Sequence, residues 1–304
     1  MDTKQIEYIL AIAEENNITH AAAKLFITQS ALNQQLIKLE KELGTTLFHR
    51  SRNNFHLTEA GEIYVQGAKE MLRIKRDTYQ RILDLTESKC GRLSVGFTAG
   101  RGLTMFVSAY AMFHREYPNI DIVLKEHNVR TLQKLIAQGD LDIGFLTLTD
   151  ADRTGDVYET IYTEELFLAV PSRHPLADIK PPAGEKYATL DPRKLQYEPF
   201  VLMDKQSTMR TLIDQIFEDA GFTPQILLET GNNHTILSMI RAQLCCGILT
   251  SYYVNELPDG ITCFRLPNRP TWEYTASYRG DRYLSAAGRC FIDLMKHQWG
   301  DNSN

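Results

Sequence analysis

A short break between two helical segments is the feature that most limits what this chain can fold into. Residues 19–40 read THAAAKLFITQSALNQQLIKLE, with apolar residues at helical spacing on both sides of residues 26–28. The first segment is short and rich in alanine, so a second helix can cross it closely. The pattern therefore predicts two short helices joined by a tight turn, which is the helix-turn-helix arrangement.

Capping signals set the limits of these helices. Residue types that favour helix N-termini stand before two of the apolar patterns, and a glycine follows the longer one. Helices are expected at residues 3–16, 20–25 and 29–43, with Thr19, Thr28 and Gly44 as caps.

The helix over residues 29–43 has two different faces. Its core face is expected to consist of Leu32, Leu36, Leu39 and Leu43. The remaining surface carries side chains that both donate and accept hydrogen bonds, as reading base edges in a DNA major groove requires. Backbone N–H groups at the start of the helix favour phosphate. We therefore predict DNA contacts from Thr28, Gln29, Ser30, Asn33, Gln34 and Lys38.

A basic segment after this helix predicts a small wing. Residues 47–58, LFHRSRNNFHLT, form two short extended segments around an Asn-rich tip. We assign Arg50 and Arg52 to phosphate or minor-groove contacts. Residues 1–60 carry six basic and seven acidic side chains. Net charge therefore does not separate DNA binding from the alternative, a small helical subdomain with a solvated polar face.

A long helix is predicted from its N-cap, Thr58, to about Glu87. Steps of four, four and three residues trace a heptad-like seam of Ile63, Gly67, Met71, Ile74, Thr78, Ile82 and Leu85. A stripe of this length is usually covered by a partner helix, so we expect two copies of the chain to pair here. The alternative is that the stripe packs on its own domain.

Beyond residue 90 the pattern changes to short apolar runs that alternate with helices. Strands are expected at 92–98, 120–126, 141–148, 164–171, 199–203, 225–230, 246–253 and 271–279, and helices at 103–118, 131–139, 211–221, 235–244 and 283–299. Continuous apolar strands between helices are typical of a parallel sheet covered on both faces. A chain of 304 residues has the length for two or three domains, so this α/β part has room for two lobes.

Loops at the carboxyl ends of these strands form a second candidate site, since open α/β sheets bind ligands there. The expected effector-binding residues are Thr98, Ala99, Gly100, Arg101, Asn128, Thr147, Met203, Ser207 and Cys246. Arg101 and the backbone N–H groups of the helix after Thr98 favour a small carboxylate or other anion. The alternative is that these residues only cap helices at strand-to-helix turns.

Composition and motifs weigh against other classes. The five cysteines are scattered without Cys-x-x-Cys spacing, which argues against disulfides or zinc and fits a reducing cytoplasm. The N-terminal segment does not read as a secretory signal, and no apolar run approaches the ~20 residues of a membrane helix. We recognise no nucleophile elbow, phosphate loop or paired metal ligands, so we expect no catalytic residue, metal or cofactor.

Two more alternatives stay open. A solute-binding transport protein would suit the α/β part but would leave the first 88 residues unexplained. A thiol redox sensor would use Cys245 and Cys246, although buried cysteines mostly act as small hydrophobic residues.

The stretch AAAKLFITQSALNQQLIKLEKELGTTLFHRSRNNFHLTEAGE resembles the N-terminal domain of LysR-type transcriptional regulators. The likeness continues through RLSVGFT, GDLDIGFL, ELFLAVPSRHPLA and YLSAAGRCFIDLM. It implies a multidomain chain: a winged helix-turn-helix, a linker helix that pairs two subunits, and a two-lobed α/β effector domain like periplasmic binding proteins. The expected limits are 1–58, 59–89 and 90–304, with lobe I at 91–161 and 270–304 and lobe II at 162–269.

The resemblance also implies partners. They are double-stranded DNA with dyad-symmetric sites, further copies of the chain in a dimer of dimers, a small-molecule effector between the lobes, and RNA polymerase as a further candidate. The family commonly has Ser-Gln-Pro-Ala where this chain has Thr28 to Ala31, and commonly Ser or Arg at the positions of Asn33 and Gln34. Amides favour adenine, where Arg would favour guanine.

Overall fold

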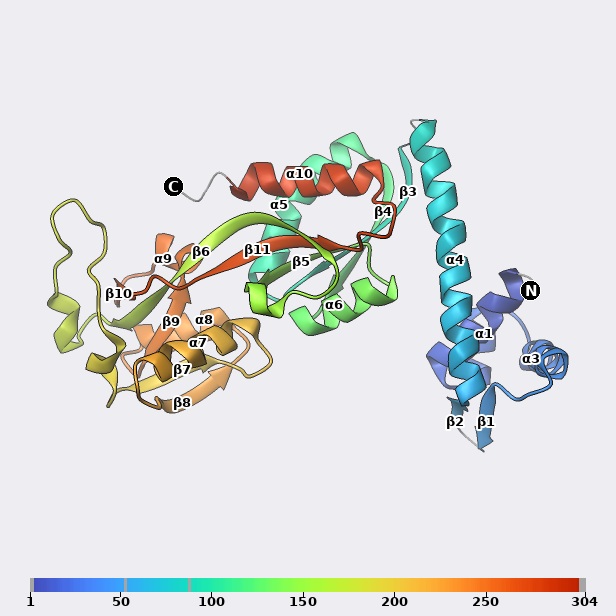
Figure 1. Cartoon of the computed structure of the whole chain (residues 1–304), viewed down its shortest axis with the longest axis horizontal. Helices are drawn as coiled ribbons and strands as arrows, with labels where there is room; N and C mark the ends of the chain where they lie inside the picture. The colour runs from blue at the N-terminus through green and yellow to red at the C-terminus, as the bar shows by residue number, and fades with distance from the viewer. Residues whose placement is uncertain (1–2, 52–53, 87–88, 301–304) are drawn as a thin grey trace. The chain divides into compact units, whose positions relative to one another are not determined.

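The computed structural model describes residues 3–51, 54–86 and 89–300 of the chain (Figure 1). Its contacts divide it into two compact units, one ending at Ile82 and the other beginning at Leu83. The boundary therefore falls inside one long helix. None of the helices in the described ranges is long and apolar enough to cross a membrane.

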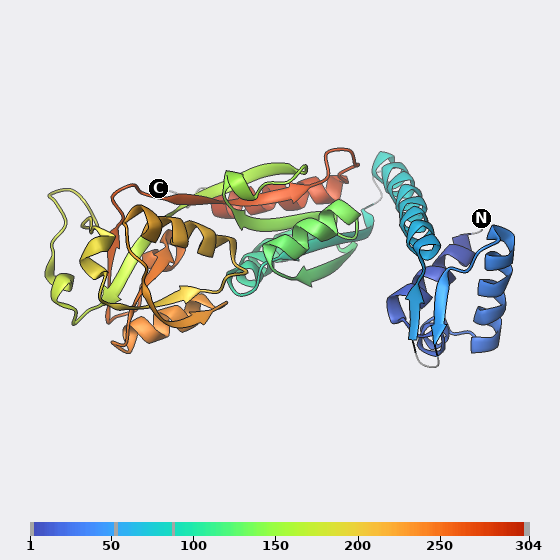
Figure 2. The ribbon, with the colours of Figure 1, turned by 60° about the horizontal axis from the view of Figure 1, so that its bottom comes forward.

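The N-terminal unit packs helices around a small apolar core. Its elements are α1 Thr3–Glu15, α2 Ile18–Lys24, α3 Gln29–Leu43, β1 Phe48–Ser51, β2 Asn54–Leu57 and α4 Glu59–Leu85. Ile9 and Ile12 of α1 are fully buried together with Leu32 and Leu36 of α3. Figure 2 shows α3 at one edge of this unit. The packing of α1, α2 and α3 confirms the predicted helix-turn-helix.

The start of α2 differs from the prediction. Asn17, not Thr19, is its N-cap, because Asn17 Oδ1 accepts the backbone N–H of Thr19 at 2.9 Å. The helix therefore begins two residues earlier than predicted, at Ile18, whose side chain is buried. Asparagine is as good an N-cap as threonine. Because Ile18 is buried as the first residue of α2, the residue before it, Asn17, is the N-cap.

The limits of α3 match the prediction, and three of its four expected core leucines are buried. Thr28 caps its start, and Gly44 ends it with a φ of 70°. Leu43 is the exception, with 45% of its surface exposed. Glu40 takes the buried position near this end, because its carboxylate accepts a 2.8 Å hydrogen bond from the backbone N–H of Leu47.

The predicted wing is present as the antiparallel pair β1 and β2, with Phe48 opposite Leu57. Arg52, expected at its tip, lies outside the described residues. The long helix α4 follows directly, and Thr58 Oγ1 caps it by accepting the backbone N–H of Gly61 at 3.0 Å. The wing and the N-cap of α4 are both where the sequence predicts them.

Between residues 89 and 300 the C-terminal unit forms a nine-stranded sheet with helices on its faces. Its strands are β3 Cys90–Phe97, β4 Asn119–Glu126, β5 Ile143–Leu148, β6 Val157–Pro171, β7 Pro199–Met203, β8 Gln225–Thr230, β9 Cys246–Thr250, β10 Ile261–Arg265 and β11 Thr271–Tyr278. Its α-helices are α5 Arg101–Glu116, α6 Val129–Gln138, α7 Thr208–Asp219, α8 Asn233–Arg241, α9 Ser251–Asn255 and α10 Ala286–Trp299. The strand order is β4-β3-β5-β11-β6-β9-β7-β8, and β10 pairs with β6.

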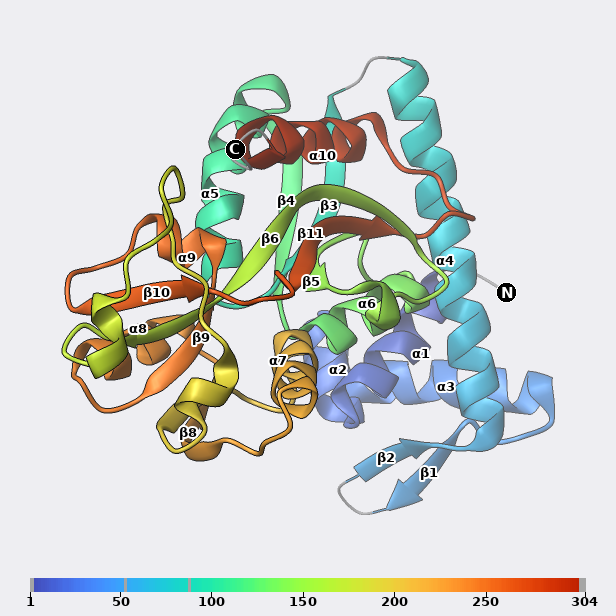
Figure 3. The ribbon, with the colours of Figure 1, turned by 60° about the vertical axis from the view of Figure 1, so that its left-hand side comes forward.

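The expectation of a parallel sheet holds only in part. β3 runs parallel to β4 and β5, and β7 runs parallel to β8 and β9. However, β6 and β11 are antiparallel to their neighbours and run side by side from one half of the unit into the other (Figures 1 and 3). Apolar runs in a strand report burial on both faces, whichever direction the strand takes.

Two hydrophobic cores divide the unit into a first and a second lobe. In the first lobe, Phe97 and Phe145 pack between the sheet and helices α5 and α10, while α6 covers the opposite face. In the second lobe, Phe200 packs against α7 and α8. β6 serves both, because Ile161 lies in the first core and Leu168 in the second.

Apart from shifts of one or two residues, three larger differences from the predicted strands remain. β6 begins at Val157, because its first half alternates polar and buried residues and so lacks a continuous apolar run. β9 ends at Thr250, since α9 begins at the next residue. β10 was not predicted, because its five residues ITCFR are too short and mixed to stand out.

Candidate functional site

The first candidate surface is the uncovered face of α3. Of the residues expected to contact DNA, Thr28, Gln29, Ser30, Gln34 and Lys38 are exposed and Asn33 is half-buried. The hydroxyl oxygen of Thr28 also accepts the backbone N–H of Ala31 at 3.2 Å. Its hydroxyl hydrogen stays available, so Thr28 caps the helix and can still donate to a phosphate.

The side chains of the two wing arginines are not described by the structure. The backbone of Arg50 lies in β1 opposite Phe55, but its side chain is not among those described. Arg52 lies outside the described residues, as noted above. The assignment of both arginines to DNA contacts therefore stays a prediction.

An apolar stripe on α4 is exposed on the single chain. Its large members Ile63, Met71, Ile74, Ile82 and Leu85 expose between 45% and 84% of their surface. By contrast, Tyr64 and Ala68 of the same helix are buried in the core of the N-terminal unit. One side of α4 thus belongs to its own unit, while the predicted seam is uncovered.

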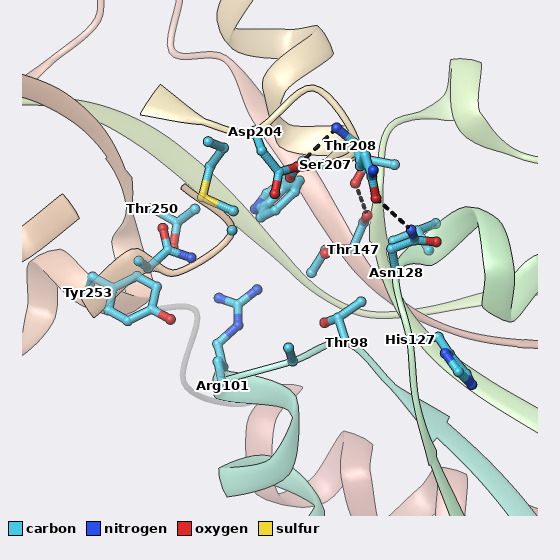
Figure 4. Close-up of a pocket in the computed structure, with 17 residues that line it drawn as sticks. Thr98, Arg101, His127, Asn128, Thr147, Asp204, Ser207, Thr208, Thr250 and Tyr253 are labelled. Carbon is cyan, nitrogen blue, oxygen red and sulfur yellow. Dashed lines mark hydrogen bonds between the residues drawn. The ribbon is translucent and has the colours of Figure 1, made fainter. Parts of the chain in front are cut away.

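The second candidate site is a cavity of about 250 Å³ between the two lobes of the C-terminal unit (Figure 4). It lies beyond the carboxyl ends of β3, β5, β7 and β9, as expected for an α/β sheet. Seven of the predicted effector residues line it: Thr98, Ala99, Arg101, Asn128, Thr147, Met203 and Ser207.

Two predicted residues do not line this cavity. Gly100 is the N-cap of α5 and supplies the turn, with a φ of 77°, but it is not one of the lining residues. Cys246 is the first residue of β9, so it lies at the end of that strand opposite to the cavity. It lines a separate cavity of about 190 Å³, together with His174 and Glu198.

Several lining residues were not predicted. Outside the nine expected residues, the cavity is lined by His127, Val129, Asp204, Gln206, Thr208, Gly231, Asn233, Thr250, Tyr253 and Trp272. Thr250 and Tyr253 take the place expected for Cys246, because β9 ends at Thr250 and α9 follows. The strand expected at 246–253 begins at Cys246, so choosing residues near its carboxyl end would have identified them.

Arg101 is the charged centre of the cavity wall. Its Nη1 donates to Glu164 Oε1 at 2.6 Å, and only 8% of the Arg101 side chain and 1% of the Glu164 side chain are exposed. Trp272 Nε1 donates to the other oxygen of Glu164 at 2.8 Å. The guanidinium also lies over the rings of Tyr252 and Tyr274.

This pairing decides the charge state of Arg101. Burial alone would lower the pKa of Arg101, but the adjacent Glu164 carboxylate outweighs burial and raises that pKa. Arg101 is therefore a permanently charged group whose position is fixed by Glu164 and, through it, by Trp272.

Direct hydrogen bonds cross from one lobe to the other at the cavity. Thr208 Oγ1 donates to the carbonyl oxygen of Thr147 at 2.7 Å. Asn128 Nδ2 donates to Gln206 Oε1 at 3.4 Å, and both bonds are drawn in Figure 4. The cavity is thus bounded by contacts that a change in lobe angle would alter.

Four longer helices, α5 to α8, begin at the cavity. Asn128 and Asn232 cap α6 and α8 with their side chains. The N-caps of α5 and α7, Gly100 and Ser207, make no side-chain capping bond. Their first N–H groups therefore remain for other acceptors, and the helix dipoles favour negative charge there.

The adjacent cysteines do not have the properties of a redox pair. All five cysteines are free, and Cys245 and Cys246 are buried. Burial raises the pKa of Cys246 to about 12, with Glu198 adding to the effect. Since the thiolate is the reactive form, this geometry argues against the redox sensor. Among the described residues, no three His, Cys, Asp or Glu side chains are grouped to hold a metal ion.

Comparison with known proteins identifies both parts of the chain. Residues 3–62 match the family model described as bacterial regulatory helix-turn-helix protein, lysR family. Residues 86–300 match the family model described as LysR substrate binding domain. Together they cover most of the chain.

Individual relatives agree. The chain is 31% identical over 301 residues to the uncharacterized HTH-type transcriptional regulator YwbI of Bacillus subtilis (strain 168), across 97% of this chain and 96% of that protein. Full-length OxyR from Pseudomonas aeruginosa shares the fold with a TM-score of 0.70 and 22% identity, across 99% of this chain and 98% of that chain. Full-length CbnR, solved with its target DNA, has a TM-score of 0.62 and 20% identity, across 98% and 99% of the two chains.

Proposed function

The chain belongs to the LysR family of transcriptional regulators, and from this premise we propose which of its residues read DNA and which hold the effector. It is a DNA-binding regulator with an effector-binding domain, and its relatives are named as regulators rather than enzymes. The observation that carries the proposal is that one chain joins an uncovered helix-turn-helix face to a cavity lined by both lobes.

The proposed reader is α3. Its exposed amides and hydroxyls at Gln29, Ser30, Asn33 and Gln34 have the donors and acceptors to contact base edges in the major groove. Thr28 and Lys38 flank this row and suit phosphate contacts. The other proposed backbone contacts come from the wing, through Arg50 and Arg52.

We propose the domain limits expected from the sequence. They are 1–58 for the winged helix-turn-helix, 59–89 for the linker helix, and 90–304 for the effector domain, with lobe I at 91–161 and 270–304 and lobe II at 162–269. The division of contacts at residues 82 and 83, inside the proposed linker helix, supports separate N-terminal and effector parts, and the two cores of the C-terminal unit support the two lobes.

The proposed assembly is a homodimer through the exposed stripe of α4, and two such dimers form a tetramer. Such a stripe is costly to leave in water, which favours a partner helix. Two-fold symmetry of the dimer would place two α3 helices on dyad-symmetric DNA. RNA polymerase is a further proposed partner, and a DNA-binding regulator of this family is proposed to work in the cytoplasm.

The proposed effector is a small molecule with a negatively charged group near Thr98 and Arg101. The uncapped start of α5 and the fixed guanidinium of Arg101 support this placement. The effector alters the angle between the lobes, and the change passes through α4 to the spacing of the two reader helices. It must bind one arrangement more tightly than the other, since otherwise it would shift nothing.

A ligand screen on the full chain tests the effector proposal. Small organic acids, phosphorylated metabolites and aromatic compounds are added one at a time while the melting temperature is followed. A ligand at 100 times its dissociation constant stabilises by ~2.7 kcal/mol, which is readily measured. The shift should disappear in Thr98→Ala but persist in Thr223→Ala, which changes an exposed threonine remote from the lining. A shift that survives Thr98→Ala would place the ligand elsewhere.

A further inference from the structure

Two opposite charges face the interlobe cavity from different lobes. Arg101 enters from the start of α5 in the first lobe, and Asp204 follows β7 in the second. Figure 4 shows both side chains directed into the cavity from its two sides. They form no ion pair with each other, so each can meet a ligand group of opposite charge.

The guanidinium of Arg101 is a buried part of the cavity wall. The Arg101 side chain is more than nine-tenths buried, yet it lines the cavity. Glu164 engages it at Nη1, which leaves further N–H groups of the guanidinium for a ligand. An oxyanion in the cavity can therefore complete the hydrogen bonding of a donor that is already held in position.

The carboxylate of Asp204 is engaged only on one side. Its Oδ1 accepts the backbone N–H of Gln206 at 3.0 Å. Within the described part of the chain, Asp204 has no ion-pair partner. Gly231 lies beside Oδ2, where a Cβ atom would come within 2.9 Å of that oxygen. The glycine thus leaves room for a ligand donor next to the free oxygen.

The balance of charge favours a ligand that carries both signs. Among the described residues that line the cavity, Arg101 is the only Arg or Lys and Asp204 the only Asp or Glu. Glu164, which is ion-paired with Arg101, offsets the charge of the guanidinium. These three side chains therefore sum to one negative charge, and a purely anionic ligand would leave Asp204 without a counter-charge. A purely cationic ligand would lie against Arg101 and the uncapped helix starts.

A buried hydroxyl adds a further polar contact. Thr250 is 1% exposed, lines the cavity, and its Oγ1 has no hydrogen-bond partner among the described residues. A buried hydroxyl without a partner is costly, so a polar ligand that reaches it gains affinity. The cavity volume of about 250 Å³ limits the ligand to a small molecule.

We propose that the effector is a small amino acid or a similar zwitterion. Its carboxylate binds Arg101 and the start of α5, and its ammonium group binds Asp204. This inference rests on the proposed effector role of the cavity. Because the two charged ends are held by different lobes, the ligand bridges them and fixes their relative angle, which neither charge alone would do.

The test uses calorimetric titration of the full chain with a panel of amino acids whose amine and carboxylate are separated by one to five carbons. Each amino acid is compared with the carboxylic acid that lacks its amine and with the amine that lacks its carboxylate. We expect at least one amino acid to bind about tenfold or more tightly than both analogues, since each charged hydrogen bond contributes that much.

Asp204→Asn then assigns the amine to Asp204. The amide keeps an oxygen for the Gln206 N–H but removes the charge, so amino-acid affinity should fall at least ~10-fold. Asp259→Asn, a neutralised carboxylate on an exposed loop, should bind like the unaltered chain. The analogue series on the unaltered chain decides the matter by itself if Asp204→Asn fails to fold.

Contrary results separate the two proposals. If a carboxylic acid binds as tightly as its amino acid, or if Asp204→Asn binds unchanged, the zwitterion is wrong while the effector cavity stands. If no amino acid of the panel binds, the zwitterion is again wrong. The effector role itself fails only if, in addition, no compound of the wider screen gives a shift that Thr98→Ala removes.

Discussion

The hydroxyl of Thr208 in the second lobe donates a 2.7 Å hydrogen bond to the carbonyl oxygen of Thr147 in the first lobe. Both residues are buried, and both line the interlobe cavity. A ligand in the cavity therefore lies against a bond whose length depends on the angle between the lobes. Thr208 also stands in the first turn of α7, so the bond ties the start of that helix to β5.

Replacing Thr208 with valine tests the weight of this bond. The side chain keeps its shape, but the hydroxyl is lost and the Thr147 carbonyl loses that partner. We expect the free energy of unfolding to fall by about 1–2 kcal/mol, measured by urea denaturation. Thr223→Val, at an exposed site, should change it by less than about 0.5 kcal/mol. Equal stability of the two variants would mean that the interlobe bond contributes nothing.

The ion pair of Arg101 and Glu164 predicts a much larger effect. Glu164→Gln leaves the almost fully buried guanidinium without its counter-charge. An uncompensated buried charge costs about 3–5 kcal/mol, so the melting temperature should fall by several degrees or more. The double change Arg101→Met and Glu164→Leu removes both charges and should recover much of this loss. If the double variant is no more stable than Glu164→Gln, charge is not the cause.

Glu159 at the start of β6 predicts an acid-sensitive contribution to stability. Burial by itself would raise its pKa, but hydrogen bonds from Lys296, Tyr278 and Arg289 outweigh burial and lower the pKa from 4.5 to about 2. The unfolded chain therefore binds a proton first as the pH falls. The stabilisation is fully present above about pH 4.5 and is lost as the pH falls toward 2.

Acid denaturation of Glu159→Gln measures this contribution. The variant should be less stable than the unaltered chain at pH 7, by about 2 kcal/mol, and the difference should shrink between pH 4.5 and 2. Glu185→Gln, at an exposed and weakly paired carboxylate, should show no such convergence. A difference that stays constant over this pH range would contradict the assignment.

The interlobe cavity shows which site residues could be predicted from the sequence. Thr98, Asn128 and Thr147 all line the cavity, because Thr98 and Asn128 follow the ends of β3 and β4 and Thr147 lies one residue before the end of β5. Cys246 was misplaced because it begins the strand expected at 246–253, whereas the cavity lies at the carboxyl end of that strand. Thr250, at the correct end, was missed for the same reason.

Contacts between distant segments were beyond prediction. Glu164 stands 63 residues from Arg101 and 108 residues from Trp272, and nothing in their local sequence links them. The antiparallel pairing of β6 and β11 places Trp272 opposite Glu164, and the start of α5 brings Arg101 to the same carboxylate. Their strand direction could not be read from apolar runs, so the fixed charge pair at the cavity wall emerges only in three dimensions.

The exposed stripe of α4 predicts a dimer that one charge disrupts. Ile74→Asp places a carboxylate on the stripe, which we expect to weaken pairing without unfolding either unit, because Ile74 is 55% exposed on the single chain. Light scattering after size-exclusion chromatography should report a smaller particle than for the unaltered chain. Gln66→Asp, exposed on the same helix but outside the stripe, serves as control. An unchanged particle mass in Ile74→Asp would exclude the stripe as the interface.

Base reading by α3 is tested most directly at Gln34. Its amide is exposed and makes no bond within the described chain, so Gln34→Ala should leave the melting temperature unchanged. A bidentate amide–adenine pair discriminates by about 1–3 kcal/mol, so selection from a randomised DNA pool should return sites that have lost a strong preference at one position per half-site. Gln35→Ala, an exposed neighbour outside the proposed reading set, should keep that preference. Identical selected sequences for both variants would remove Gln34 from the reading face, whereas a uniform loss of affinity would reassign it to the phosphate backbone.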